Sequence, residues 1–429
     1  MASNSNLSVV IDIGTSKIVG LAGQKTEEGK MGILAVSKVP SKGVKRGVVF
    51  NIEELASCLK VVIADLEKQL DAEITGVEIA FAGQQMKTAD YRGYRYTSDE
   101  GVVSDFDINE LYNEARNYKV EQDYRTIHIV PQSFVIDDEI RELSPVGITG
   151  RKLEANYKLF IVPEVHILNF QRVFEKVGVN IEGITLSPLA ISESALSEDE
   201  KENGAVLLDI GAGTTKLAVF HNSVLKHVAV IPFGGDVVTK DIREGCSILL
   251  KWAEQLKVKY GEALGDFADE QKVVTIPGHN GWEPKEITFK SLAFIIQARM
   301  EEIIDNVNLQ IGKSGVEEKL GFGVVVSGGT ADMSNLISLV KFRTGLDARK
   351  AFPVIHPVNR RKEFQNQDLL TAFGLLKMTL EKEEESESIR TKRKKEKKKK
   401  ENNGLSPWRK AIQGVLDYID DDNDDLAMN

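Results

Sequence analysis

Two short stretches, Asp12-Ile-Gly-Thr-Ser-Lys17 and Asp209-Ile-Gly-Ala-Gly-Thr-Thr-Lys216, are the strongest indication of the fold in this sequence. Each follows an apolar run rich in β-branched residues and leads into a second such run, which predicts a strand, a polar turn and another strand. One pattern of this kind is most simply a turn with a solvent-facing aspartate and lysine. Two copies in different halves of the chain indicate an internal duplication, with a cleft between two similar lobes.

The residue types of both stretches suit a nucleoside triphosphate. Small turn residues let backbone N–H groups approach phosphate oxygens, and Lys17 could contact a phosphate as a point charge. Asp12 and Asp209, each at a strand end, could hold Mg²⁺ through its waters, because this ion keeps much of its hydration shell. The remaining candidates are Gly14, Thr15 and Ser16 in the first stretch and Gly211, Ala212, Gly213, Thr214, Thr215 and Lys216 in the second. Neither stretch is a Walker loop or a dinucleotide fingerprint.

Two further elements could contact the rest of such a ligand. Ser327-Gly328-Gly329-Thr330 follows an apolar strand and precedes a helical run, and its glycines would let a base or sugar approach the backbone; the alternative is an ordinary turn. Glu254 and Lys257 lie three positions apart and share one face of a predicted helix that ends at Gly261. For this pair the alternative is an ion pair on the protein surface.

Composition narrows the class of protein. A chain of 429 residues that is 42% hydrophobic predicts a folded protein with more than one domain or lobe, and its net charge of −10 argues against nucleic acid as a partner. We expect Cys58 and Cys246, which lie in separate apolar helical patterns, to be reduced core residues. The polar N-terminus carries no secretory signal, and no uncharged apolar stretch reaches the roughly 18 residues that span a bilayer. We therefore expect a cytosolic protein whose membrane contact is peripheral.

Periodicity predicts the remaining elements. Helices are expected from a cap at Asn51, over 165–177, from Pro188, over 333–344 and over 369–380, and strands over 78–82, 181–186, 205–209 and 322–327. Between about 87 and 162 the character changes to polar turns, a short helix near 109–117 and strands around 126–136 and 152–161. This segment is interpreted as a small inserted domain.

With these elements in order, the sequence resembles the actin/Hsp70/sugar-kinase superfamily and, within it, the FtsA family of bacterial division proteins. The resemblance runs from about Val9 to Leu380, and the segment from about Gly83 to Pro163 resembles the small domain peculiar to that family. Its most specific stretches are Pro40-Ser-Lys-Gly43, His128-Ile-Val-Pro-Gln132, Pro145-Val-Gly-Ile-Thr-Gly150, Gly234-Gly-Asp-Val-Val-Thr239 and Ala253-Glu-Gln-Leu-Lys-Val258.

The resemblance implies an actin-like α/β fold of two lobes with duplicated RNase H-like domains. It implies lobe 1 at 7–83, 164–203 and about 365–380, the inserted domain at 84–163, the core of lobe 2 at 204–240 and 300–364, and the tip of lobe 2 at 241–299. We expect a disordered charged linker at 381–404, an amphipathic helix at 405–419 and an acidic tail at 420–429.

The resemblance also implies function. It implies a cleft for ATP and Mg²⁺ that adds Gly234, Gly235, Glu254, Lys257, Gly328, Gly329 and Thr330 to the residues above. It further implies self-assembly into protofilaments, recruitment of the tubulin-like protein FtsZ to the cytoplasmic face of the membrane at the division site, and contacts with later division proteins. The FtsZ C-terminal tail would dock on the tip of lobe 2, between about Asp241 and Arg299.

One position departs from hydrolytic members of the superfamily. There a carboxylate or amide at the start of the helix after strand 181–186 positions the attacking water, whereas Ser187-Pro188 stands here. A serine hydroxyl is a poor base and holds water less well. We therefore assign no catalytic residue and predict slow ATP turnover, with the nucleotide acting mainly as an assembly ligand.

The C-terminal segment contains one apolar stripe. Ser406-Pro407 suits a helix start, and steps of three and four align the stripe residues Leu405, Trp408, Ile412, Val415, Leu416 and Ile419. Behind the basic run Arg390–Lys400, this stripe suits a helix at the surface of an anionic membrane. The alternative is a helix that docks on its own lobe or on a partner, and the acidic residues Asp420–Asp425 count against membrane binding.

Two other classes of protein are alternatives to this membrane-tethered cytoskeletal protein. A small-molecule kinase of the same superfamily would need a carboxylate base beside a substrate pocket, and Ser187-Pro188 argues against it. A chaperone of the Hsp70 type would need a substrate domain, and none follows Leu380.

Overall fold

The computed structural model describes residues 7–26, 28–98, 101–278, 283–358 and 367–384. Met1–Met378 form one compact unit, which contains all the sheets described below, and Thr379–Asn429 form a second unit. In the second unit residues 379–384 are helical, and the predicted amphipathic helix and acidic tail lie outside the described residues. Residues 381–384, predicted as part of the disordered linker, are helical, because Glu and Lys are good helix formers.

The first sheet is built around the first hairpin. Its strand order is β11-β6-β1-β2-β3, formed by β1 (Ser8–Ile13), β2 (Lys17–Lys25), β3 (Met31–Pro40), β6 (Gly76–Phe81) and β11 (Asn180–Leu186). The pairs β1–β2 and β2–β3 are antiparallel, whereas β1–β6 and β6–β11 are parallel. Because β1 and β6 are buried on both faces, their sequences are almost continuously apolar.

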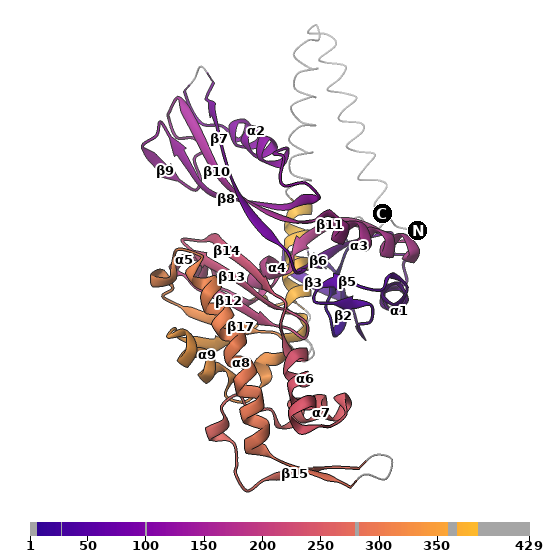
Figure 1. Ribbon diagram of the computed structural model, residues 1–429. Helices are drawn as coiled ribbons and strands as arrows, with labels where there is room; N and C mark the ends of the chain where they lie inside the picture. The colour runs from indigo at the N-terminus through magenta and orange to yellow at the C-terminus, as the bar shows by residue number, and fades with distance from the viewer. Residues whose placement is uncertain (1–6, 27, 99–100, 279–282, 359–366, 385–429) are drawn as a thin grey trace. The chain divides into compact units, whose positions relative to one another are not determined.

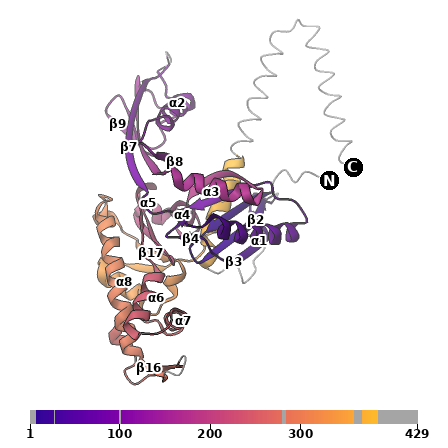
Figure 2. The same cartoon turned by 45° about the vertical axis from the view of Figure 1, so that its right-hand side comes forward.

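Two helices pack against one another beside this sheet, α1 (Ile52–Leu70) and α3 (Glu164–Val177), as Figure 2 shows. Asn51 caps α1 as predicted, since its side chain accepts hydrogen bonds from the backbone N–H groups of Glu53 and Glu54 at 3.1 and 3.2 Å. The buried face of α1 repeats at steps of three and four, and contributes Leu55, Leu59, Val62, Ile63 and Leu66 to the core. Helix α1 therefore covers strands β2 and β3.

The second sheet repeats the first. Its order is β14-β13-β12-β17-β18, formed by β12 (Ala205–Ile210), β13 (Thr215–His221), β14 (Val224–Ile231), β17 (Gly323–Ser327) and β18 (Ala348–Lys350). The first three strands pair antiparallel, and β12–β17 and β17–β18 pair parallel. This pairing is that of the first sheet, strand for strand, which confirms the predicted duplication.

Helices on the second sheet are α6 (Gly235–Cys246), α8 (Phe289–Gly312) and α9 (Leu336–Thr344), seen in Figure 1. Helix α9 begins three residues later than predicted, because the 3₁₀ turn Gly329–Asp332 and a bend come first. Helix α7 (Leu250–Tyr260) ends at Gly261 as expected, and β15 (Val273–Ile276) pairs with β16 (Lys285–Thr288) near α7 and α8. Cys246 is buried and Cys58 half-buried, and both are free thiols.

The inserted segment forms its own antiparallel sheet, of order β7-β10-β8-β9, with one helix, α2 (Asp105–Arg116) (Figure 1). Its strands are β7 (Lys87–Tyr96), β8 (Tyr124–Ile136), β9 (Ile140–Glu142) and β10 (Lys152–Pro163). Strand β7 escaped prediction because it lies at the sheet edge, is mostly exposed and has no apolar run. Helix α2 begins earlier than predicted, since Ser104 and Asp107 form a capping box.

The remaining elements connect these layers. A small hairpin, β4 (Val44–Lys45) and β5 (Val48–Val49), precedes α1, while α4 (Ser187–Ala195) and α5 (Glu198–Asn203) lead from the first sheet to the second. A helix over 370–378 closes the first unit. Among the helices in the described part of the chain, none has the length and apolarity needed to cross a bilayer.

Candidate functional site

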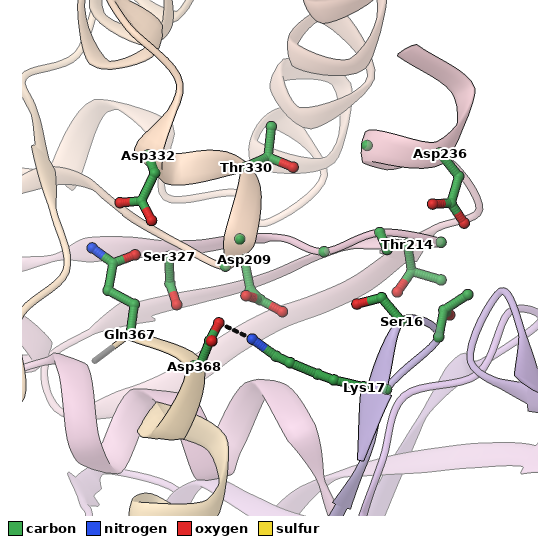
Figure 3. A pocket seen from close by; sticks show the side chains of 18 of the residues that line it. Ser16, Lys17, Asp209, Thr214, Asp236, Ser327, Thr330, Asp332, Gln367 and Asp368 are labelled. Atoms are coloured by element: carbon green, nitrogen blue, oxygen red, sulfur yellow. Dashed lines mark hydrogen bonds and ion pairs between the residues drawn. The ribbon is translucent and has the colours of Figure 1, made fainter. Parts of the chain in front are cut away.

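A cavity of about 720 Å³ is lined by both hairpin turns. Its other walls come from the start of α6, from α7, from the turn after β17 and from the segment that precedes the helix over 370–378 (Figure 3). This volume is within the range of small-molecule binding sites. The cavity thus joins segments that lie far apart in the sequence.

The two hairpin turns have the same backbone geometry. The N–H of Gly14 donates to the carbonyl of Lys17 at 3.0 Å, and the N–H of Gly211 donates to the carbonyl of Thr214 at 3.0 Å. The turns also face one another closely, because a Cβ atom added to Gly213 would lie 2.5 Å from Thr15 Oγ1. Glycine at 213 is therefore what allows the turns to approach from opposite sides.

The lysines of the two motifs occupy different places. In the second hairpin Asp209 pairs with Lys216 across the strands, and Lys216 Nζ donates to Asp209 Oδ2 at 2.9 Å. In the first hairpin the residue across from Asp12 is Val19. Lys17 stands next to the turn, and its ammonium forms an ion pair with Asp368 (Figure 3).

Burial and neighbouring charges shift the pKa values of the side chains where the two turns meet. Burial raises the pKa of Asp12; Lys216 opposes this shift, and the neighbouring Asp209 adds to it. Burial lowers the pKa of Lys17 to about 8, helped by the charge of Lys38. Burial would also lower the pKa of Lys216, but Asp209 and Asp12 outweigh it and hold that pKa above its usual value. Two aspartates and two lysines therefore interact where the turns meet.

Helices α6 and α7 are joined at the other end of the cavity. Lys257 Nζ lies 2.8 Å from Glu254 Oε2 and donates to the carbonyl of Gly235 at 3.0 Å and to Thr239 Oγ1 at 2.7 Å. The Lys257 side chain is only 11% exposed. Both residues line the cavity, and they also form the ion pair that was the alternative, with the Glu254 side chain 49% exposed.

The cavity brings together all the predicted nucleotide-site residues except two. Thr215 is fully buried on β13, and Gly234 precedes the first residue of α6 and is not part of the lining. Ser187 lines the cavity from the start of α4, where the sequence placed it.

Sequence reasoning missed the lining carboxylates Asp236, Asp332 and Asp368, together with Gln367 and Thr371. Burial raises the pKa of Asp236, which follows the predicted Gly234-Gly235 directly and could have been found from that position. Thr371 forms a side-chain hydrogen bond with Asp12. Nothing local marks Gln367, Asp368 or Thr371, since they reach the site only through the fold.

Two family models match the sequence. The model described as "Cell division protein FtsA" matches residues 206–374, and that described as "SHS2 domain inserted in FTSA" matches residues 83–161. The second match coincides with the separate antiparallel sheet and its helix. The inserted segment is therefore a domain of the kind found in this family.

Curated relatives named cell division protein FtsA align along most of the chain. The protein of Neisseria meningitidis is 31% identical over 345 residues, covering 80% of this chain and 83% of the relative. That of Pseudomonas aeruginosa is 30% identical over 381 residues, covering 89% and 91%. That of Bacillus subtilis is 31% identical over 354 residues, covering 82% and 80%.

Solved structures of other proteins share the fold. The PilM–PilN type IV pilus biogenesis complex aligns with a TM-score of 0.62 and 14% identity, covering 87% of this chain and 98% of that chain. MreB5 of Spiroplasma citri bound to ADP aligns with a TM-score of 0.53 and 14% identity, covering 89% and 99%. These neighbours show an actin-like fold, and the curated relatives with their inserted domain show that the chain belongs to the FtsA family of cell division proteins.

Proposed function

We propose that the cavity binds ATP with Mg²⁺, and that this chain uses the nucleotide to assemble on the membrane during cell division. The observation that carries the proposal is the opposition of two equivalent glycine-containing turns across one cavity. Backbone N–H groups of such turns can donate to phosphate oxygens from both sides. The fold neighbour MreB5 has been solved with ADP and with AMPPNP, which supports the same class of ligand here.

The glycines of the cavity suit a nucleotide. Gly328 has φ +90°, and an added Cβ would lie 2.6 Å from Asp209 Oδ1, so a larger residue would crowd the turn. Gly329 has open space where its Cβ would stand, which leaves the backbone accessible to a flat ring. Glu254 and Lys257 lie on the same wall as Gly235, where they could contact the sugar. The phosphate groups would then lie between the two turns.

The carboxylates also fit a hydrated magnesium ion. Asp12 and Asp209 end equivalent strands and are close enough for each charge to act on the other. Lys216 is held by Asp209, so its charge balances the carboxylates without closing the cavity. Oxygen ligands of this kind, used through water, are those that Mg²⁺ prefers. Magnesium would neutralise phosphate charge between the turns.

Ser187 supports slow hydrolysis. It is buried at the start of α4 and lines the cavity, and it offers a hydroxyl where a water-positioning carboxylate or amide would act. We expect steady-state phosphate release well below about 1 s⁻¹, the lower end of ordinary phosphoryl-transfer enzymes. Phosphate release at or above that rate, measured with purified protein and MgATP, would contradict this part of the proposal.

The division role is inferred from family membership. The chain would form protofilaments on the cytoplasmic face of the cell membrane at the division site, bind the FtsZ C-terminal tail on the lobe 2 tip at 241–299 and recruit later division proteins. Lobe 1, the insert and the lobe 2 core would follow the boundaries given above. The stripe with Trp408 at residues 405–419 would attach the chain reversibly, and many copies in a polymer would hold firmly through multivalency.

Two measurements test this proposal. Titration calorimetry with MgATP should show one site per chain, and absence of binding to the full chain would refute the nucleotide role. Electron microscopy on lipid monolayers should show filaments with ATP and few without it.

Liposome pelleting separates the membrane role from assembly. We expect the full chain to pellet with anionic vesicles and a chain ending at Asn403 to stay in solution. Trp408→Ala should reduce pelleting, with Gln413→Ala, off the stripe, as the matched control. Equal pelleting of the full and shortened chains would rule out tethering by residues 405–419.

A further inference from the structure

The cation of the first hairpin is held by a carboxylate from the far end of the first unit. Lys17 and Lys38, which lies on β3, both form ion pairs with Asp368. Asp368 stands two residues before the helix over 370–378. Figure 3 shows the Lys17 side chain extended along the cavity toward Asp368.

This ion pair differs from the other lysine pairs of the cavity. Lys216 is held by Asp209 of its own hairpin, and Lys257 by Glu254 of its own helix. In each of those pairs both residues belong to one hairpin or one helix, so the pair stays together when that element moves. Lys17 and Asp368 are 351 positions apart, so among these three lysine pairs of the described cavity, this is the one that joins a hairpin turn to a separate segment.

We propose that Asp368 competes with the anionic ligand for Lys17, so that a polyphosphate must take the lysine from Asp368 when it enters the cavity. The inference rests on the proposed nucleotide site and identifies Asp368 as a residue that regulates ligand binding there. Binding of a polyphosphate then breaks the contact between Lys17 and the segment that begins the helix over 370–378. Asp368 is a positioning residue, because it acts on the ligand through Lys17.

The exposure of the groups makes this exchange feasible. The side chains of Lys17 and Asp368 are 25% and 22% exposed and both line the cavity, so a ligand that enters the cavity can reach the pair. A triphosphate carries several negative charges, whereas Asp368 carries one. The backbone N–H groups of the turns can also donate hydrogen bonds to the triphosphate. After the exchange Asp368 keeps Lys38 as its partner, so no carboxylate is stranded.

The same segment also touches the candidate magnesium ligand. Thr371, three residues after Asp368, forms a side-chain hydrogen bond with Asp12. Asp368 lies in the 3₁₀ turn Gln367–Leu369, directly before the helix that carries Thr371, so one short segment contacts both Lys17 and Asp12. A ligand that moves Lys17 toward the turns breaks the ion pair between Lys17 and Asp368. The hydrated cation that comes with the ligand changes the hydrogen bond between Asp12 and Thr371. Both contacts of this segment therefore change together.

The test is the affinity for MgATP, measured by titration calorimetry on the full chain. Asp368→Asn removes the competing charge, and we expect affinity to rise about twofold to fivefold, the range for one partly exposed ion pair. Asp368→Ser, a second variant, should act alike. Asp305→Asn is the matched control, because it breaks the exposed pair with Arg343 away from the cavity, and it should leave affinity unchanged.

A double-mutant cycle shows whether Asp368 acts through Lys17. In a Lys17→Met background, Asp368→Asn should no longer change the affinity. An unchanged or weaker affinity of Asp368→Asn, or an equal gain without Lys17, overturns the inference while leaving nucleotide binding intact. If the unaltered chain binds neither MgATP nor tripolyphosphate, the proposed function itself fails and the inference with it.

Discussion

The two hairpins share a fold but distribute their charges differently. In each, four residues separate the last paired positions, Ile13 and Ile18 in the first and Ile210 and Thr215 in the second. The lysine comes five residues after the aspartate in the first motif and seven after it in the second. Seven places Lys216 across the strands from Asp209, whereas five leaves Lys17 at the turn.

This difference shows that two motifs with the same backbone geometry can give their lysines different partners. Lys216 is tied to its own aspartate and holds the second hairpin together. Lys17 has no such partner in its hairpin and reaches a residue of another segment. The lysine of the first hairpin can therefore exchange its carboxylate partner for a ligand, whereas the lysine of the second hairpin stays with its own aspartate.

The largest expected effect is on stability, and it separates the two lysines. Lys216→Met leaves the buried Asp209 without its partner, so we expect a loss of about 3–5 kcal/mol in the free energy of unfolding. Lys17→Met breaks a partly exposed pair and should cost at most about 1 kcal/mol. Denaturant unfolding of both variants measures this. Equal losses would show that the two lysines are equivalent after all.

The next effect concerns the approach of the turns. Gly213→Ser gives the second turn the residue that stands at the corresponding place in the first, Ser16, and its Cβ would lie 2.5 Å from Thr15 Oγ1. Overpacking typically costs about 1–3 kcal/mol, so we expect MgATP affinity to fall about tenfold. Adding Thr15→Gly should restore part of it. Unchanged affinity of Gly213→Ser in calorimetry would show that the spacing of the turns does not matter.

The pH dependence of binding tests the exchangeable cation. The pKa of Lys17 is about 8, below its usual 10.5, so its charge is present below pH 8 and is lost as the pH rises through 8. A phosphate ligand prefers the charged form, and MgATP affinity should therefore fall above pH 8, by at most about tenfold per pH unit. In Lys17→Arg the charge persists and the profile should be flat. A flat profile in the unaltered chain would exclude Lys17 as the titrating group.

The smallest effect is expected at Thr215. Its Oγ1 is buried without a hydrogen-bond partner, and the corresponding residue of the first hairpin is the buried Ile18. Thr215→Val removes an unsatisfied hydroxyl at nearly constant volume, so we expect stability to rise by about 0.5–1 kcal/mol with MgATP affinity unchanged. Thermal unfolding and calorimetry measure the two quantities. A drop in affinity would return Thr215 to the predicted phosphate contacts.

Much of the fold was predictable because its signals are local. The apolar strands, the polar turns and the cap at Asn51 each depend on neighbouring residues, and the duplication follows from seeing one pattern twice. The edge strand β7 was missed because few of its side chains are buried, whereas the early start of α2 has a local signal, the capping box of Ser104 and Asp107, that the prediction overlooked. The stripe at Trp408 lies outside the described residues and stays a prediction.

The site divides in the same way. The two turns, their aspartates and glycines and the family to which they belong could be predicted from the sequence, because these depend on residue type and short spacing. The fold was needed to show that Lys216 faces Asp209 while Lys17 meets Asp368, and that Gln367 and Thr371 line the cavity. The physical reason is that strand register sets which side chains oppose one another, and that contacts between distant segments leave no mark in either segment alone.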